Sequence, residues 1–128
     1  MRMMSFALTE RQLLDGSKTV TRRTGWQNLK PGDRLLAVRK AMDLKAGEKV
    51  QALCEIDVVS VRRERLCDMA DEDCAREGFP EFHRAGPFVD MFCAKMRCNQ
   101  YDEVTRIEFC KVAGSERVAS QIALRLSA

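Results

Sequence analysis

Asp-Gly-Ser-Lys-Thr-Val-Thr-Arg-Arg, residues 15–23, is the stretch of the sequence that says most about the fold. The residues before it, 9–14, favour a short helix that begins with a capping box. Gly16 suits the end of that helix, because without a Cβ atom it enters the left-handed conformation at little cost. Residues 19–21 favour an extended strand. We therefore expect a helix, a glycine stop and a strand, with Lys18 at the junction, a place where functional groups are often held.

The size and composition of the chain are those of a globular protein with one core. Its 128 residues, of which 45% are hydrophobic and 32% charged, suit a single domain. No apolar run approaches the roughly 20 residues that span a bilayer, and the first residues lack the apolar centre of a secretory signal. We therefore expect a cytoplasmic protein with no membrane partner.

The six cysteines are expected to be reduced thiols rather than a disulfide scaffold. A chain of this size has an adequate core, and no secretory signal is seen in the sequence. Free cysteine behaves largely as a small buried hydrophobic residue. Cys54, Cys93 and Cys110 have apolar neighbours and are therefore predicted to belong to the core.

The charge of the chain is mildly basic. A net charge of +3 and a pI of about 8.6 permit a polyanionic partner without requiring one. Three basic pairs stand apart in the sequence, at 22–23, 39–40 and 62–63. Either each pair belongs to the solvated surface, or the pairs share a basic cleft, in which Arg is a good partner for phosphate.

The order of the expected elements predicts an α+β fold. Beyond the first helix and strand, we expect strands at 34–39, 50–61 and 103–112 and helices at 71–77 and 87–96. Apolar residues alternate only partly along the long strand, which indicates a bulge. Short strands interrupted by helices, without regular βαβ alternation, are typical of α+β proteins. A small mixed barrel would leave a cleft beside the helices, but closure of a barrel does not follow from the pattern.

We divide the chain into one domain, residues 1–112, and a C-terminal tail, residues 113–128. In a tail helix, Val118, Ile122 and Leu126 would share one face. Such a tail can pack on the body, mediate self-association or remain mobile. The sequence leaves these alternatives and the oligomeric state open.

Lys18 and Thr21 form the first candidate pair for catalysis. On one regular strand, residues three apart point to opposite faces, so the two converge only if Lys18 still belongs to the turn after Gly16. A lysine shielded from water loses part of its preference for the charged form. The neutral amine can then act as a base toward the Thr21 hydroxyl and make it a nucleophile. The simpler alternative is a solvated lysine beside an ordinary strand residue.

The sequence contains few other candidates for catalytic or metal-binding residues. His83 is the only histidine and no Cys-x-x-Cys pair is present, so neither a metal site nor a two-histidine mechanism is expected. No glycine-rich phosphate or dinucleotide motif appears, and no cofactor is expected. Glu77 stands at a helix end from which it can turn toward a cleft, whereas the acidic residues in 68–73 suit a solvated helix start. Trp26 can stack on a base or cap the core.

Residues 15–23, followed by Leu-Lys-Pro-Gly-Asp-Arg at 29–34, resemble the signature of ASCH-domain proteins in the PUA-like superfamily. Members of this family often have Gly-x-Lys-Thr-x-Thr-x-Arg and then a Pro-Gly-Asp turn into the next strand. The tail from Ala113 lies outside the resemblance. Within it lie residues 4–112, including the segments 58–63, 75–79 and 105–109.

The resemblance implies a small β-barrel with peripheral helices and a positively charged cleft for RNA or a nucleoside- or nucleotide-like ligand. One branch, the small bacterial N4-acetylcytidine amidohydrolases, uses a lysine, a threonine and a glutamate that fall on Lys18, Thr21 and Glu77. In that branch's scheme Thr21 would attack the amide carbonyl, Lys18 would assist as base, and Glu77 would orient groups or move a proton. This chain has Arg22-Arg23 directly after Thr21, where that branch has one apolar residue before its arginine.

Three kinds of function follow from these observations. The first is an ASCH-type domain that binds RNA or a nucleoside or nucleotide in a basic cleft and hydrolyses an amide on an acylated pyrimidine nucleoside. The second is a non-enzymatic RNA-binding module. A ribonuclease is a third, although no histidine pair is present to act as acid and base. The residues expected to bind the ligand are Arg22, Arg23, Trp26, Arg39 and Lys40.

Overall fold

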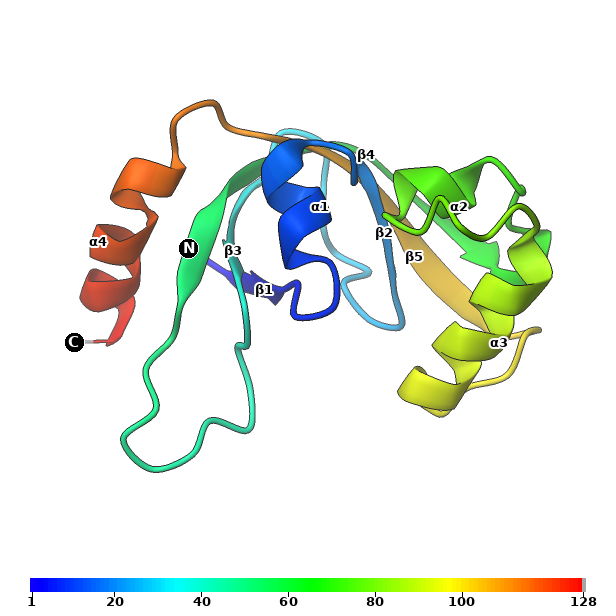
Figure 1. The fold of residues 1–128 in the computed structure, drawn as a ribbon, viewed down its shortest axis with the longest axis horizontal. Helices are drawn as coiled ribbons and strands as arrows, with labels where there is room; N and C mark the ends of the chain where they lie inside the picture. Colours follow the sequence, from blue (N-terminus) through cyan, green and yellow to red (C-terminus); the bar gives the residue numbers. More distant parts are fainter. Residues whose placement is uncertain (128) are drawn as a thin grey trace.

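The computed structural model describes residues 1–127, with the side chains of residues 1–125. It shows a mixed α/β fold in which five strands form one sheet and short helices surround it (Figure 1). The strands are β1 (Met3–Ser5), β2 (Val20–Arg23), β3 (Arg34–Val38), β4 (Ala52–Arg65) and β5 (Glu103–Lys111). The helices are α1 (Glu10–Asp15), a 3-10 turn (Leu66–Asp68), α2 (Asp73–Arg76), α3 (Ala85–Met96) and α4 (Glu116–Ser127).

The sheet has the strand order β1-β3-β4-β5-β2, with β1 parallel to β3 and the other neighbours antiparallel. The edge strands β1 and β2 are not paired with each other in the part of the chain that the structure describes. The sheet is therefore open, and the closed barrel that the resemblance implies is not confirmed. The three-residue strand β1 was missed by the sequence analysis, because so short a segment carries no alternation of polar and apolar residues.

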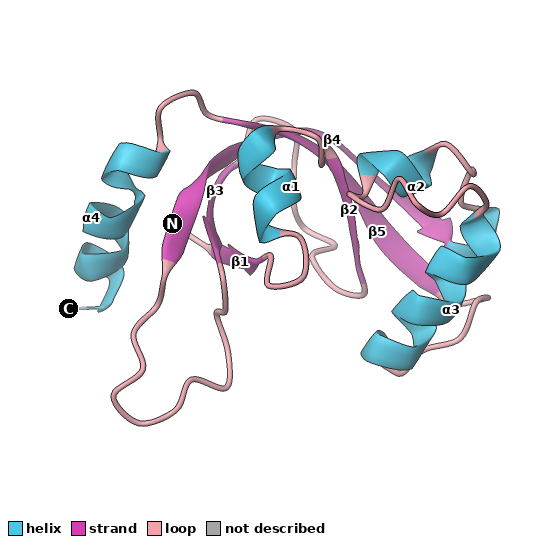
Figure 2. Cartoon of the chain, viewed as in Figure 1, coloured by secondary structure: helices cyan, strands magenta, loops and turns pink. Residues whose placement is uncertain are grey.

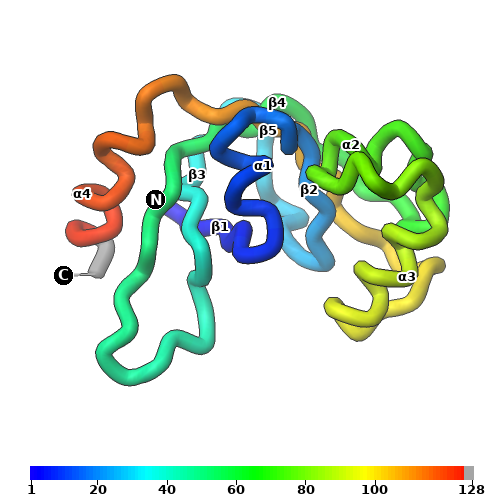
Figure 3. Tube along the Cα trace, viewed as in Figure 1, coloured from blue at the N-terminus to red at the C-terminus, as the bar shows by residue number. Residues whose placement is uncertain are grey.

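The helices occupy different ends of the sheet. Helix α1 lies across it, α2 and α3 lie beside one end, and α4 lies beside the other (Figure 1). The N-terminus and the last described residues of α4 lie toward the same end of the sheet (Figure 3). The loop between β3 and β4, residues 39–51, projects from the sheet as a long excursion (Figure 2). No helix among residues 1–127 has the length and apolar character needed to cross a membrane.

The local structure around residues 9–16 agrees with the sequence in one respect and differs in another. Gly16 ends α1 in the left-handed conformation, with φ of 83°, as predicted. The capping box was wrong, because the Thr9 side chain makes no cap hydrogen bond. Gln12 instead donates from Nε2 to the carbonyl oxygen of Gly78, 3.1 Å away. A contact distant in sequence has therefore replaced the local one.

Strand β4 contains the predicted bulge. Its register with β5 shifts between Val58 and Ser60, and Val59 is exposed there. The extra residue lets the strand bend while both of its halves stay paired with β5. Strand β4 can thus extend from the end of the sheet beside α4 to the end beside α2 and α3.

Three hydrophobic clusters hold the elements on the sheet. The first lies between α1 and the sheet and includes Leu13 and Ile56. The second includes Phe88 of α3 and Val104 of β5. The third joins α4 to β3 and includes Ala119. Each large apolar side chain buried in this way contributes roughly 1.5–3 kcal/mol of transfer free energy.

Helix α4 packs on the sheet through small residues. Ala119 and Ala123 are buried there, whereas Val118 is exposed. Because the alanine side chain is small, this face of the helix can lie closer to the strands than the face that carries Val118. Ile122 is partly buried beside them, and the side chain of Leu126 lies outside the described residues.

All six cysteines are free thiols. Cys54 is buried as predicted, and burial raises its pKa to about 11. Cys93 is half-buried. The prediction for Cys110 was wrong: it is exposed, because it alternates along β5 with the buried Phe109.

Candidate functional site

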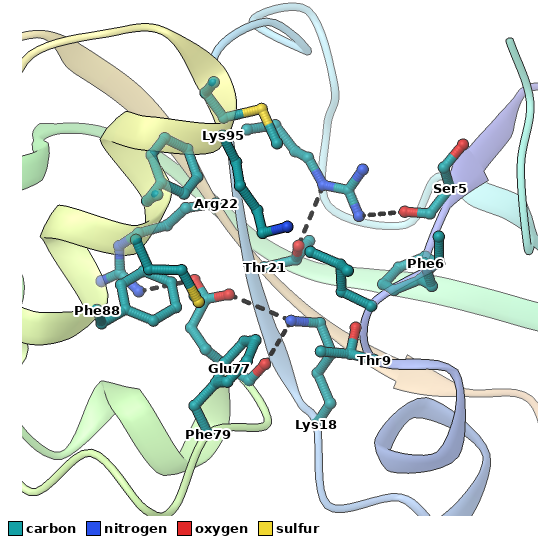
Figure 4. A pocket seen from close by; sticks show the side chains of 16 residues that line it. Ser5, Phe6, Thr9, Lys18, Thr21, Arg22, Glu77, Phe79, Phe88 and Lys95 are labelled. Atoms are coloured by element: carbon teal, nitrogen blue, oxygen red, sulfur yellow. Dashed lines mark hydrogen bonds and ion pairs between the residues drawn. The ribbon is translucent and has the colours of Figure 1, made fainter. Parts of the chain in front are cut away.

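A cavity of about 280 Å³ opens beside the edge strand β2 (Figure 4). One wall comes from the end of β1 and the residues before α1, a second from residues 18–23, and a third from α3. Most of its lining is apolar and aromatic, with a small number of charged groups among these side chains. The residues that line it are Ser5, Phe6, Ala7, Leu8, Thr9, Lys18, Thr21, Arg22, Arg23, Glu77, Phe79, Phe88, Met91, Phe92, Lys95 and Met96.

Lys18 lies at the junction between α1 and β2, and its side chain is buried. The backbone N–H of Lys18 donates to the Gln12 carbonyl at 3.0 Å, and that of Thr19 donates to the Arg76 carbonyl at 2.8 Å. These bonds hold the junction between α1 and β2 against α2. The Lys18 amine then reaches Glu77, donating to its carbonyl oxygen at 2.6 Å and to Oε1 at 3.2 Å. Burial lowers the pKa of Lys18, and the attraction of Glu77 offsets that effect only in part.

Glu77 turns into the cavity from the end of α2. Its residue is the C-cap of that helix, and Gly78 follows in the left-handed conformation with φ of 95°. A Cβ atom on Gly78 would lie 3.2 Å from Cβ of Gln12, so the close approach of α1 also favours glycine here. Both carboxylate oxygens of Glu77 are used: Oε1 by Lys18, and Oε2 by Nη1 of Arg22 at 3.0 Å.

Arg22 lies behind the cavity with its side chain fully buried. Besides Glu77, its guanidinium donates to Glu64 at 2.7 and 3.0 Å and to Asp73 at 2.5 Å. Burial alone would lower the pKa of Arg22, but the attraction of Glu77 and the bonds to Asp73 and Glu64 outweigh it and raise the pKa. Arg22 thus uses four of its five N–H groups to hold three carboxylates in place.

Asp73 is the acidic centre of this cluster. It accepts hydrogen bonds from Arg22, from Arg76 at 2.9 Å, and from Arg106 at 2.8 and 3.1 Å. Arg106 is the cross-strand neighbour of Arg22 on β5, so Asp73 bridges two like charges that the sheet places side by side. Burial alone would raise the pKa of Asp73, but the bonds from the three arginines hold it well below its usual range.

Three members of this cluster were not predicted from the sequence: Glu64, Asp73 and Arg106. The assignment of Asp73 to a solvated helix start was wrong, because its side chain is buried among arginines. The usable signal was Arg22 itself, which stands where the N4-acetylcytidine amidohydrolases named in the sequence resemblance have an apolar residue. A buried arginine at that position requires acidic partners from elsewhere in the chain.

Thr21 and Arg23 lie on the face of β2 opposite to that of Arg22. The buried Thr21 hydroxyl oxygen accepts a hydrogen bond from Nε of Arg23 at 3.1 Å. Nη2 of Arg23 donates to the Ser5 carbonyl at 2.6 Å, so this guanidinium bridges the two open edges of the sheet. It also lies 4.9 Å from the centre of the Phe6 ring. Burial lowers the pKa of Arg23 to about 10.

The structure brings Lys18, Thr21, Glu77, Arg22 and Arg23 to one cavity. Lys18 contacts Glu77 directly, whereas no hydrogen bond links Thr21 to either of them among the described residues. Figure 4 shows the three side chains directed into the same space, with Lys95 of α3 reaching toward Thr21.

The other predicted ligand-binding residues lie outside the lining of this cavity. Trp26 packs against the first hydrophobic cluster, and the Arg2 guanidinium lies 4.1 Å from its ring centre. Arg39 forms a bidentate ion pair with Glu10, with N–O distances of 2.8 and 2.9 Å. Lys40 lies 3.4 Å from Glu48. Their role in binding a ligand stays a prediction. No group of three or more His, Cys, Asp or Glu side chains in residues 1–125 is arranged to hold a metal ion.

Solved structures with a similar arrangement of elements support a fold assignment. A crystal structure of an ASCH domain from Lactobacillus crispatus JV V101 matches with a TM-score of 0.55 and 16% identity, over 86% of this chain and 78% of that one. The chain has an ASCH-like fold. A second crystal structure, of protein EF3133 from Enterococcus faecalis V583 with the family model DUF984, matches with a TM-score of 0.60 and 12% identity, over 88% of this chain and 82% of that one. Neither the models of protein families nor the curated proteins give a match to the sequence. At these identities the likeness establishes the fold alone.

Proposed function

We propose that the cavity binds an acylated pyrimidine nucleoside and hydrolyses its amide bond, with Thr21 as the nucleophile. The observation that carries this proposal is that a buried lysine, a buried glutamate and a buried threonine line one small cavity in an ASCH-like fold. Its volume of about 280 Å³ is near the lower end of the range of small-molecule pockets. The aromatic side chains of the lining suit a planar base, and charged side chains lie among them.

The hydrogen bonds leave the proposed base, Lys18, able to accept a proton and the proposed nucleophile, Thr21, able to donate one. Lys18 uses two N–H groups for Glu77, and in the neutral amine the third position on nitrogen is a lone pair. Thr21 accepts a bond from Arg23 and keeps its own O–H proton to donate. The lone pair and the proton are what a proton transfer from Thr21 to Lys18 requires. Such contacts often shorten only when substrate binds.

The reaction then proceeds in two stages. Thr21 Oγ1 forms a bond to the acyl carbon while its proton passes to Lys18. The carbon–nitrogen bond breaks, and the exocyclic amine of the pyrimidine leaves with the proton from Lys18. Water next attacks the acyl ester on Thr21, and one of its protons returns to the threonine oxygen and restores the hydroxyl. The acid leaves as a carboxylate and its proton passes to solvent. Glu77 keeps the Lys18 amine oriented, and Arg23 stabilises negative charge on the threonine oxygen.

The test is release of acetate from N4-acetylcytidine. The wild-type protein should turn over this substrate, and Thr21→Ala should lose detectable turnover while retaining its circular dichroism spectrum and melting temperature. Thr24→Ala is the matched control, because Thr24 is exposed just beyond β2. Lys18→Ala should lower kcat by about 100-fold or more, as expected for loss of a general base. Turnover by Thr21→Ala at the wild-type rate would refute the role of Thr21.

RNA binding is a second candidate, favoured by the ASCH-like fold and by cations outside the cavity. Arg39 and Lys40 each form an ion pair at the surface. Exposed pairs of this kind are worth about 0–1 kcal/mol, so a phosphate group can replace the carboxylate. Binding of single-stranded RNA should then fall steeply with salt and weaken in Arg39→Ala combined with Lys40→Ala. Binding that is absent, or independent of salt, counts against this function.

A further inference from the structure

Arg23 differs from its neighbour Arg22 in the partners that surround its charge. Arg22 binds three carboxylates, whereas Arg23 donates only to the neutral oxygens of Thr21 and Ser5. The Phe6 ring attracts the Arg23 cation weakly. Glu77 also attracts it, but both oxygens of that carboxylate already bind other cations.

The Arg23 guanidinium has N–H groups that make no hydrogen bond to another described residue. Arginine has five N–H groups, and the bonds to Thr21 and Ser5 use one on Nε and one on Nη2. No fully buried side-chain nitrogen or oxygen among residues 1–125 lacks a hydrogen-bond partner. Nη1 of Arg23, which has no such partner among them, therefore reaches solvent, and Arg23 lines the cavity. A pKa of about 10 leaves it charged at neutral pH.

Lys95 supplies a second cation from the opposite wall. It belongs to α3, is exposed, and lines the cavity. Figure 4 shows its amine directed toward Thr21. No ion pair or hydrogen bond joins the Lys95 amine to another described residue, and Glu77 is the one carboxylate among the residues that line the cavity. Two cations therefore face the space above Thr21 without an acidic partner of their own.

We propose that Arg23 and Lys95 form a binding site for a phosphate ester, so that the cavity prefers a nucleotide to the corresponding nucleoside. A phosphate monoester carries about −1.5 to −2 charges near neutral pH, which matches the two cations. The planar guanidinium can donate two parallel bonds to phosphate oxygens, and Lys95 adds a point charge from α3. This inference rests on the proposed function in one respect: the base of the ligand occupies the same apolar part of the cavity.

The test is calorimetric titration with cytidine, cytidine 5′-monophosphate and cytidine 3′-monophosphate at low ionic strength. At least one monophosphate should bind about 10-fold or more tightly than cytidine, and inorganic phosphate should compete with it. Lys95→Ala should remove most of that preference, and Arg23→Gln should do the same. The matched controls are Lys30→Ala and Arg34→Gln, which change exposed cations outside the cavity and should keep it.

The outcomes separate this inference from the hydrolase proposal. Equal binding of cytidine and both monophosphates, no binding of any of the three, or an unchanged preference in Lys95→Ala would overturn the phosphate site. Lys95 is exposed, so that variant should fold even if Arg23→Gln does not. A nucleotide preference in a protein that releases no acetate from N4-acetylcytidine would sink the hydrolase alone. Hydrolysis of acetylcytidine without nucleotide preference would sink the phosphate site alone.

Discussion

The basic pairs at 22–23 and 39–40 look equivalent in the sequence and differ in almost every physical respect. The Arg22 side chain is fully buried and binds Glu64, Asp73 and Glu77, whereas the Arg39 side chain is 52% exposed and binds one carboxylate. A cation in water costs little and its ion pair is replaceable. A buried cation requires its partners, and together they form a fixed charge arrangement around the cavity. Burial, rather than residue type, decides what each pair can do.

The largest expected effect comes from removing the acid that the buried cations share. Asp73→Asn leaves Arg22 and Arg106 without the carboxylate between them, so the free energy of unfolding should fall by about 3–5 kcal/mol. Urea denaturation of the wild type and the variant measures it. The matched control is Asp57→Asn, which removes the surface partner of Arg34 and should cost about 1 kcal/mol or less. Equal losses in the two variants would abolish the contrast between buried and exposed pairs.

The second effect is the response of stability to acid. The folded state holds the pKa of Asp73 well below its usual range, so below pH about 4 the unfolded chain binds more protons there than the folded one. The stability from Asp73 is complete above that pH and is lost as the pH falls toward the folded-state pKa. Urea unfolding between pH 3 and pH 6 should show a shallower decline in Asp73→Asn. A decline of the same slope in both proteins would be evidence against this linkage.

The smallest effect is expected at the exposed pair. Arg39→Ala removes the ion pair with Glu10 and should lower the free energy of unfolding by about 1 kcal/mol or less. Because salt screens exposed charges, the difference should shrink further at high ionic strength. Thermal melts at low and high salt would measure this. A loss as large as that of Asp73→Asn would show that the surface pair is not replaceable and would weaken the case for RNA binding through Arg39.

The features predicted correctly from the sequence are those that depend on neighbouring residues. Gly16 ends α1 because its backbone conformation favours glycine, and the bulge in β4 follows from its irregular apolar pattern. Lys18 was expected at the junction before the strand, and it lies there. Each of these depends on a few consecutive side chains.

The features that the sequence did not predict depend on residues far apart in the chain. Gln12 contacts Gly78 instead of capping its own helix, and Asp73 is buried by arginines from β2 and β5. The partners in such contacts are far apart in the chain, and their spacing follows no pattern that can be recognised in a single sequence. The open edge of the sheet belongs to the same class, because closure depends on how strongly the strands twist and bend rather than on their residue types.

The register of β2 has a consequence for how the protein is made. Thr21 pairs with Ile107 of β5, and no other strand among residues 1–127 adjoins β2. Strand β2 leaves the ribosome early, yet it has no strand to join until β5 has been synthesised. The closure of so long a loop also delays pairing in the refolding chain. The cavity is therefore completed late, and a nascent chain that ends before β5 cannot present Lys18 and Thr21 as they lie in the finished protein.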